Sequence, residues 1–228
     1  MGLSTKDLGN EGGSGQAKTI SPGNHRLKIN SISLEDFQFI PGAKHLLLNV
    51  ETEPIEGFTG FLINKDDESK GNYSGQIGRV KASQYAYADG ETKSGIKIQR
   101  DKSLMIFLAN LSKAYGIMSW FEDQDNKYNT IEDFVMNYSN NAPIKDKYID
   151  FCVAGKEYEN KAGYTAYDMW LPKTENNKYA YGQADSSKIL EYNEAKHLKK
   201  IEVKPVDNFG DDDDFQTPPK SSSDFTLD

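Results

Sequence analysis

Residues 21–37 read "SPGNHRLKINSISLEDF", and this stretch decides how the fold begins. It opens with turn-forming residues and then alternates, with Leu27, Ile29 and Ser31 on one face and Lys28 and Asn30 on the other. A period of two is typical of a strand that is buried on one side. The alternation therefore predicts a first strand that starts just after Ser21.

Two further strands are predicted directly downstream. Residues 43–63, "AKHLLLNVETEPIEGFTGFLI", contain an apolar run, a turn at residues 53–57 and a second apolar run at residues 61–63. Strands joined by such short connections typically pair as an antiparallel meander. A long polar insert follows at residues 64–100, with several glycines and hardly any aliphatic side chains, which predicts a long loop. Loops of that length are uncommon in compact domains and are often functional.

Two helices are predicted after the insert. Residues 101–116, "DKSLMIFLANLSKAYG", have apolar residues at helical spacing, with Asp101 as the expected N-cap and Gly116 as the stop. Residues 130–138, "TIEDFVMNY", predict a shorter helix, because Thr130 is followed three residues later by Asp133, as in a capping box.

The pattern returns to strands after Pro143. Residues 148–154 and 164–171 predict a hairpin around a turn rich in Gly and Asn, with Phe151 and Trp170 expected in the core. Residues 186–206 predict a helical turn that leads into a last strand. Because the strands cluster before and after the helices, the expected fold class is mainly β (α+β), a small β-barrel with one or two helices.

Charge and composition divide the chain into three parts. Residues 1–20 are rich in Gly and Ser and predict a flexible N-terminal arm, residues 21–206 form the body, and residues 207–228, "DNFGDDDDFQTPPKSSSDFTLD", predict a disordered acidic tail. Seven aspartates and one lysine give the tail a charge of −6 out of the −8 of the whole chain. The rest of the chain is therefore nearly balanced, at −2.

Residues that would carry catalysis are not grouped in the sequence. The three histidines are scattered without metal-ligand spacing, Cys152 is the one cysteine, and there is neither a P-loop nor a GxSxG motif. We therefore expect no enzyme activity, no metal site and no cofactor. The lone cysteine and the absence of an apolar stretch of membrane-spanning length predict a protein of the cytoplasm.

Basic and aromatic residues alternate in two segments, which favours binding of single-stranded nucleic acid. Cations neutralise phosphates there, and aromatic rings stack on bases of any identity. The insert contributes Tyr73, Arg79, Lys81, Tyr85, Tyr87, Lys93, Lys97 and Arg100, and the hairpin contributes Lys156, Tyr158, Lys161 and Tyr164. The alternative for Tyr85 and Tyr87 is a small core under the loop.

Taken together, these segments resemble bacteriophage single-stranded-DNA-binding proteins of the oligonucleotide/oligosaccharide-binding (OB) fold. The resemblance rests on "SPGNHRLKINSISLED", "LLLNVETEPIEGFTGFLI", "NYSGQIGRVKASQYAYADG" and the acidic "FGDDDDF". It implies an OB-like barrel, a role in phage DNA replication or recombination, and a location in the cytoplasm of the infected bacterial cell.

The resemblance also implies a role for the tail, which in such proteins recruits replication and recombination partners. The residues concerned are Asp211, Asp212, Asp213, Asp214, Phe215 and Phe225. Which phenylalanine anchors a partner, which partner that is, the oligomeric state and the choice between DNA and RNA stay open. The main alternative is a non-catalytic phage structural or protein-interaction module, and a nuclease comes third.

Overall fold

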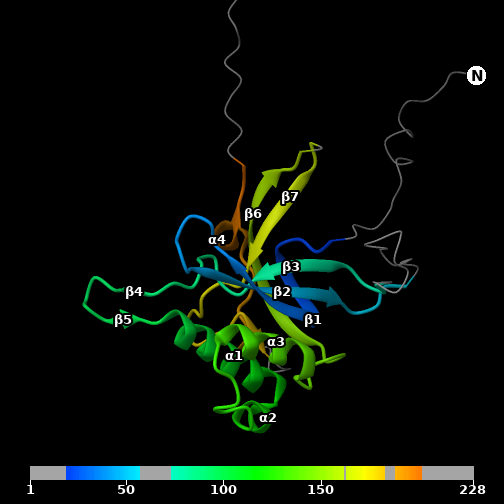
Figure 1. The fold of residues 1–228 in the computed structure, drawn as a ribbon. Coiled ribbons are helices and arrows are strands. Elements are labelled where there is room, and N and C mark those ends of the chain that lie inside the picture. The colour runs from blue at the N-terminus through cyan, green and yellow to red at the C-terminus, as the bar shows by residue number, and fades with distance from the viewer. Residues whose placement is uncertain (1–18, 57–72, 162, 183–187, 202–228) are drawn as a thin grey trace, which may run out of the picture.

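The computed structural model describes residues 19–56, 73–161, 163–182 and 188–201. The expected arm, the third strand predicted at residues 61–63 and the acidic tail lie outside these residues, apart from Thr19 and Ile20. Strands dominate the described part, and three helices gather on one side of them (Figure 1). The elements are β1 (Gly23–Asp36), β2 (Lys44–Thr52), β3 (Ile77–Lys81), β4 (Gly90–Glu91), β5 (Lys97–Ile98), α1 (Arg100–Tyr115), α2 (Met118–Glu122), α3 (Ile131–Asn141), β6 (Ile149–Glu159), β7 (Thr165–Trp170), β8 (Tyr181–Gly182), α4 (Glu194–His197) and β9 (Leu198–Lys199).

Strand β1 is the stretch on which the sequence prediction began, and it is long enough to pair with two partners. Its first part, Gly23 to Leu27, pairs with β6, and the part from Leu27 onward pairs with β2. The predicted inward position of Ser31 is wrong, because a β-bulge between Ile29 and Ser31 shifts the alternation by one residue. Ile32 faces the core instead.

The main sheet is mixed. Its strands pair in the order β1-β2-β3-β7-β6-β8, β1 also pairs with β6, and β9 pairs with β6. The β3–β7 and β6–β9 pairings are parallel, and the others are antiparallel. Segments that are far apart in the chain therefore lie next to each other around β3 and β6.

The prediction that residues 64–100 form one long loop is wrong in its middle. Residues 77–81 form β3, which lies between β2 and β7 and places Val80 in the core. Ile20 packs over this strand, and a Cβ atom on Gly78 would come within 2.4 Å of its side chain. The glycine that weakens the strand pattern in the sequence thus makes room for Ile20.

The two predicted helices are confirmed, with a change at one end of each, since α3 continues three residues past its predicted end, to Asn141. Helix α1 begins two residues early, with Gln99 in place of Asp101 as its N-cap and Asp101 in its first turn, and it ends at Gly116 in the left-handed conformation at φ 67°. Thr130 caps α3 as predicted, because its hydroxyl oxygen accepts a hydrogen bond from the backbone N–H of Asp133. No helix in the described ranges has the length and apolar character needed to cross a membrane.

The core lies between the sheet and helices α1 and α3. Leu104, Leu108 and Leu111 of α1 are fully buried there, together with Tyr138 of α3, whose hydroxyl lies 2.9 Å from the Ser112 hydroxyl. The expected core position of Phe151 is confirmed. Trp170 is buried as expected, but it lies outside this core cluster, with Lys199 Nζ 5.6 Å from the centroid of its ring. The helices therefore cover the inner side of the sheet and leave the other side to be considered as a binding surface.

Candidate nucleic-acid interface

Strands β1, β2 and β3 direct polar side chains away from the core and form a shallow groove. The groove has a volume of about 390 Å³. Ser31, Asn49 and Arg79 lie side by side in it, since Asn49 pairs with both of the others in the sheet and its Nδ2 donates to Ser31 Oγ at 2.8 Å. Tyr73 lines the same groove. The structure therefore brings together two residues predicted from the insert, Tyr73 and Arg79.

Tyr73 is positioned by a buried carboxylate next to it. Glu51 Oε1 accepts hydrogen bonds from the backbone N–H groups of Ser74 at 3.0 Å and Gly75 at 3.4 Å, and Oε2 accepts from Asn30 Nδ2 at 3.1 Å. Lys28 lies 3.2 Å from the same carboxylate. Burial alone would raise the pKa of Glu51, but these hydrogen bonds and the Lys28 charge outweigh it and hold the pKa below its usual value.

The surface continues from β3 to β7 through paired charges. Lys81 Nζ lies 2.8 Å from Asp168 on β7, and Arg79 forms an ion pair with Glu35 on β1. Both predicted cations are therefore present on this side of the sheet, each with an acidic neighbour. We call the side that carries Ser31, Asn49, Arg79, Lys81 and Asp168 the outer face.

The β6–β7 hairpin extends the outer face beyond the sheet. Lys156 pairs with Asp168, and Tyr158 follows two residues later on the same side of β6. Tyr158 and Tyr164 are 46% and 71% exposed. Lys156 and Lys161 are exposed and form no ion pair with another described residue. The hairpin stands out from the body in Figure 1, so all four predicted residues are open to a ligand.

The turn between β1 and β2 carries an aromatic cluster that the sequence analysis missed. Phe37 makes edge-to-face contacts with Phe39 and His45 at centroid distances of 5.3 and 5.1 Å. Phe39 is 79% exposed, and Ile40 beside it is also exposed. His45 lies close to Lys81 and Asp168 of the outer face: burial lowers its pKa, the Lys81 charge lowers it further, and the Asp168 charge raises it. The signal in the sequence was "FQFIPG", two aromatic residues before a Pro-Gly turn.

The two tyrosines of the insert separate into different environments. Residues 83–86 bulge out opposite His45, because Ala82 bonds to Leu46 while Tyr87 bonds to Lys44. Tyr85 lies in this bulge and is exposed. Tyr87 packs against the core, and burial raises its pKa to about 12. Tyr85 can therefore contact a ligand, whereas the ring of Tyr87 is occupied by packing.

The three remaining predicted cations lie on other elements. Lys93 and Lys97 belong to the β4–β5 ribbon, which projects to one side in Figure 1. Arg100 starts α1, where it donates to Asp101 at 2.7 Å and to the Gly42 carbonyl at 2.8 Å. These contacts give Arg100 a structural role between α1 and the β1–β2 turn.

No known family matches. Neither a protein-family model, nor a curated protein, nor a solved structure is similar enough to this chain to count as a match. Function must therefore be inferred from the chemistry of the surfaces described above.

A cysteine and a histidine meet in the fold, although their distance in the sequence does not predict it. Cys152 Sγ lies 3.9 Å from His197 Nδ1, which accepts a hydrogen bond from the Asn193 backbone N–H at 2.9 Å. Burial raises the pKa of the Cys152 thiol to about 11 and lowers the pKa of His197. A protonated, buried thiol beside a neutral imidazole is a packing arrangement rather than an activated nucleophile.

Metal ligands are not grouped in the described part of the chain. Within it, no cluster of three or more His, Cys, Asp or Glu side chains could hold an ion. The four tail aspartates, Phe215 and Phe225 lie outside the described residues, so their predicted role in binding partners stays a prediction.

Proposed function

We propose that this protein binds single-stranded DNA without sequence preference, through the outer face and the β6–β7 hairpin of an OB-like barrel. The role would be non-catalytic, in phage DNA replication or recombination inside the host cell. Partner proteins would be recruited by Asp211 to Phe215 and by Phe225.

The strand pairing supports the OB-like barrel. β1, β2, β3, β7 and β6 pair in sequence around a ring, because β6 also pairs with β1, and the β3–β7 pairing is parallel. The helices α1, α2 and α3 come between β3 and β6 in the chain. OB folds bind oligonucleotides on their second and third strands and on the loops that follow the first and fourth strands. In this chain those elements are β2, β3, the β1–β2 turn and the β6–β7 hairpin.

The observation that carries the proposal is where the exposed aromatic rings lie. Phe39 lies on the β1–β2 turn, and Tyr158 and Tyr164 lie on the β6–β7 hairpin, which are the loops expected to hold bases. Exposed apolar side chains that gather on one surface often mark a binding site, whereas single scattered ones do not. Stacking on a base contributes about 1–3 kcal/mol per ring and does not depend on the identity of the base.

The charges on the outer face are suited to moderate, salt-sensitive binding. Lys156 and Lys161 are free to neutralise phosphates, while Arg79 and Lys81 would have to exchange Glu35 and Asp168 for phosphate oxygens. Exposed ion pairs contribute about 0–1 kcal/mol, so this exchange costs little. Each phosphate contact on a single strand adds about 0.7 to the slope of log K against log salt.

A test follows from these contacts. Fluorescence anisotropy of a labelled poly-dT oligonucleotide measures binding to the full chain over a range of salt concentrations. We expect the K156A/K161A variant to bind more weakly and to lower the salt slope by about 1.4. The control is K145A/K147A, which removes two exposed lysines that precede β6. Absence of binding, or binding that salt does not weaken, would contradict the proposal.

The alternative function is a protein-interaction module that does not bind DNA. The observation in its favour is that Arg79 and Lys81 already have acidic partners, while Phe39 and Ile40 form an exposed apolar tip. Reversing charge on the outer face with R79E/K81E separates the two, since DNA binding should collapse and protein docking through the turn should not. Cleavage of the oligonucleotide on addition of magnesium would instead indicate a nuclease.

A further inference from the structure

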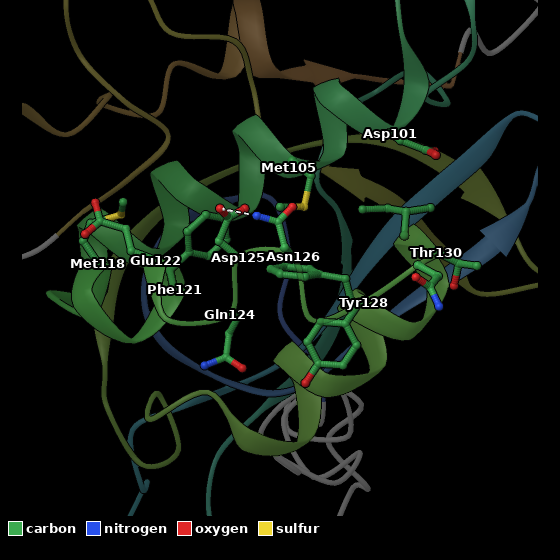
Figure 2. Close-up of a pocket in the computed structure, with 13 residues that line it drawn as sticks. Asp101, Met105, Met118, Phe121, Glu122, Gln124, Asp125, Asn126, Tyr128 and Thr130 are labelled. Atoms are coloured by element: carbon green, nitrogen blue, oxygen red, sulfur yellow. Dashed lines mark hydrogen bonds between the residues drawn. The ribbon is translucent and has the colours of Figure 1, made fainter.

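A second surface lies among the helices and is chemically unlike the outer face. A pocket of about 490 Å³ lies between α1, α2, the segment that follows α2, and the start of α3 (Figure 2). Its apolar lining includes Met105, Met118, Phe121, Tyr128 and Phe134. Phe134 makes edge-to-face contacts with Phe121 at 5.5 Å and with Tyr128 at 5.8 Å, so the aromatic floor is rigidly packed.

The rim of this pocket is acidic. Asp101, Glu122 and Asp125 line it, and no lysine or arginine does. Asp101 forms an ion pair with Arg100. Asp125 accepts a hydrogen bond from Asn126, as Figure 2 shows. Glu122 and Asp125 form no ion pair with another described residue. An apolar floor with an acidic rim suits a ligand that presents an apolar side chain next to a cation.

The β4–β5 ribbon has the complementary chemistry. Ile96, just before β5, and Ile98, within it, are 64% and 42% exposed. Lys93 lies in the turn of the ribbon, and Lys97 lies between the two isoleucines, opposite Glu91 in the ladder. Neither lysine forms an ion pair with another described residue. The ribbon is a separate two-stranded sheet, and a hairpin of that size is only marginally stable without a partner.

We propose that the β4–β5 ribbon of one copy of this protein docks into the acid-rimmed pocket of a second copy. Ile96 or Ile98 would enter the apolar floor, and Lys93 and Lys97 would face Glu122 and Asp125. No ribbon residue from 90 to 98 lines the pocket of its own chain, so the contact is between chains. It joins two different surfaces, which makes it a head-to-tail contact that can repeat into an open row of molecules.

Such a row goes beyond DNA binding by a single molecule, and it can be tested without DNA. A negative result for self-association is therefore distinguishable from a negative result for DNA binding. Sedimentation at physiological salt measures self-association of the full chain, and we expect the average mass to rise with concentration. K93E/K97E on the ribbon and E122K/D125K on the rim should each weaken the association about tenfold or more, because like charges would face each other.

Mixing supplies the decisive control. In an equimolar mixture of K93E/K97E and E122K/D125K, each ribbon finds a pocket of opposite charge, so association should return although neither variant associates alone. K145E/K147E makes the same change in net charge as the ribbon variant, away from both surfaces, and should associate like the unmodified chain. A chain that stays monomeric, or variants that associate normally or fail to recover on mixing, would overturn the proposal.

Disulfide trapping tests the geometry independently of charge. Cys152 is buried, so cysteines introduced as S94C on the ribbon and Q124C on the pocket lining would be the accessible thiols among described positions. Mixed S94C and Q124C chains should form a cross-linked heterodimer, and the double variant should form a ladder. Replacing Q124C with N140C, on an exposed position of α3, should abolish the product, and an equal yield there would count against the docking.

Discussion

Glu51 shows how a single residue links the groove to the fold. Its buried carboxylate holds residues 74 and 75 and is itself held by Asn30 and Lys28. The E51Q variant keeps the shape but loses the charge, and we expect it to lower the free energy of unfolding by about 1–3 kcal/mol. Urea titration near neutral pH measures this, and E91Q, at an exposed position, should leave stability unchanged.

The same residue gives a prediction for acid conditions. The pKa of Glu51 is lower in the folded chain than in the unfolded chain, so its stabilising effect is complete above the unfolded value of 4.5 and is lost as the pH falls through the folded value. The difference in stability between the unmodified chain and E51Q should therefore shrink in acid. A difference that stays constant from neutral to acid pH would contradict this assignment.

His197 should affect the free energy of unfolding nearer neutral pH than Glu51 does. Burial lowers its pKa from 6.5, and this effect is partly offset by the Glu175 charge and increased by the Lys196 charge. The ring is packed among Cys152, Tyr192 and Asn193. The unfolded chain then takes up a proton more readily, so the free energy of unfolding should fall as the pH drops below about 6.5, by at most about 1.4 kcal/mol per pH unit. H197Q should flatten this fall without removing it, because burial also lowers the pKa of His25 and His45.

Among the elements, the β6–β7 hairpin gives the clearest functional prediction. Tyr158 and Tyr164 lie on its exposed arm, and neither belongs to the core. Y158A and Y164A should each weaken poly-dT binding by about 1–3 kcal/mol in anisotropy titrations, while the unfolding transition stays in place. Y179A, which removes a tyrosine of similar exposure from another segment, is the control. Equal losses from all three variants would indicate that the hairpin is not the stacking surface.

The elements also show which parts of the fold the sequence could predict. Strand β1, the β6–β7 hairpin and helices α1 and α3 were predictable because each has its own apolar period or cap. Strand β3 was not, because one buried residue, Val80, and a glycine in five residues do not form a pattern. Its identity as a strand comes from β2 and β7 on either side.

The candidate site was predictable only in residue type. The rings and cations of the insert and the hairpin were found in advance, but their ion pairs were not, since Arg79 meets Glu35 and Lys81 meets Asp168 across the sheet. Phe39 and His45 were missed because nothing in the sequence places the β1–β2 turn next to β3. Such neighbours are fixed by strand register, which is a property of the assembled sheet.

For the whole molecule, the prediction concerns the acidic tail. Residues 207–228 carry six of the eight net negative charges. A chain that ends after Val206 should therefore bind poly-dT more tightly than the full chain at low salt, and the difference should fade as salt screens the charges. Anisotropy at both salt concentrations measures this. Equal affinity of the two forms at low salt would show that the tail does not compete with DNA.

The double pairing of β1 has a consequence for how the chain folds during synthesis. The β1–β2 pairing can form soon after the ribosome releases the front of the chain, but the first half of β1 has to wait for β6, far downstream. Until then Gly23 to Leu27 is an open strand edge, which other nascent chains can pair with. The slowest step should therefore be the arrival of β6 on that edge, since closing so distant a contact is costly in chain entropy.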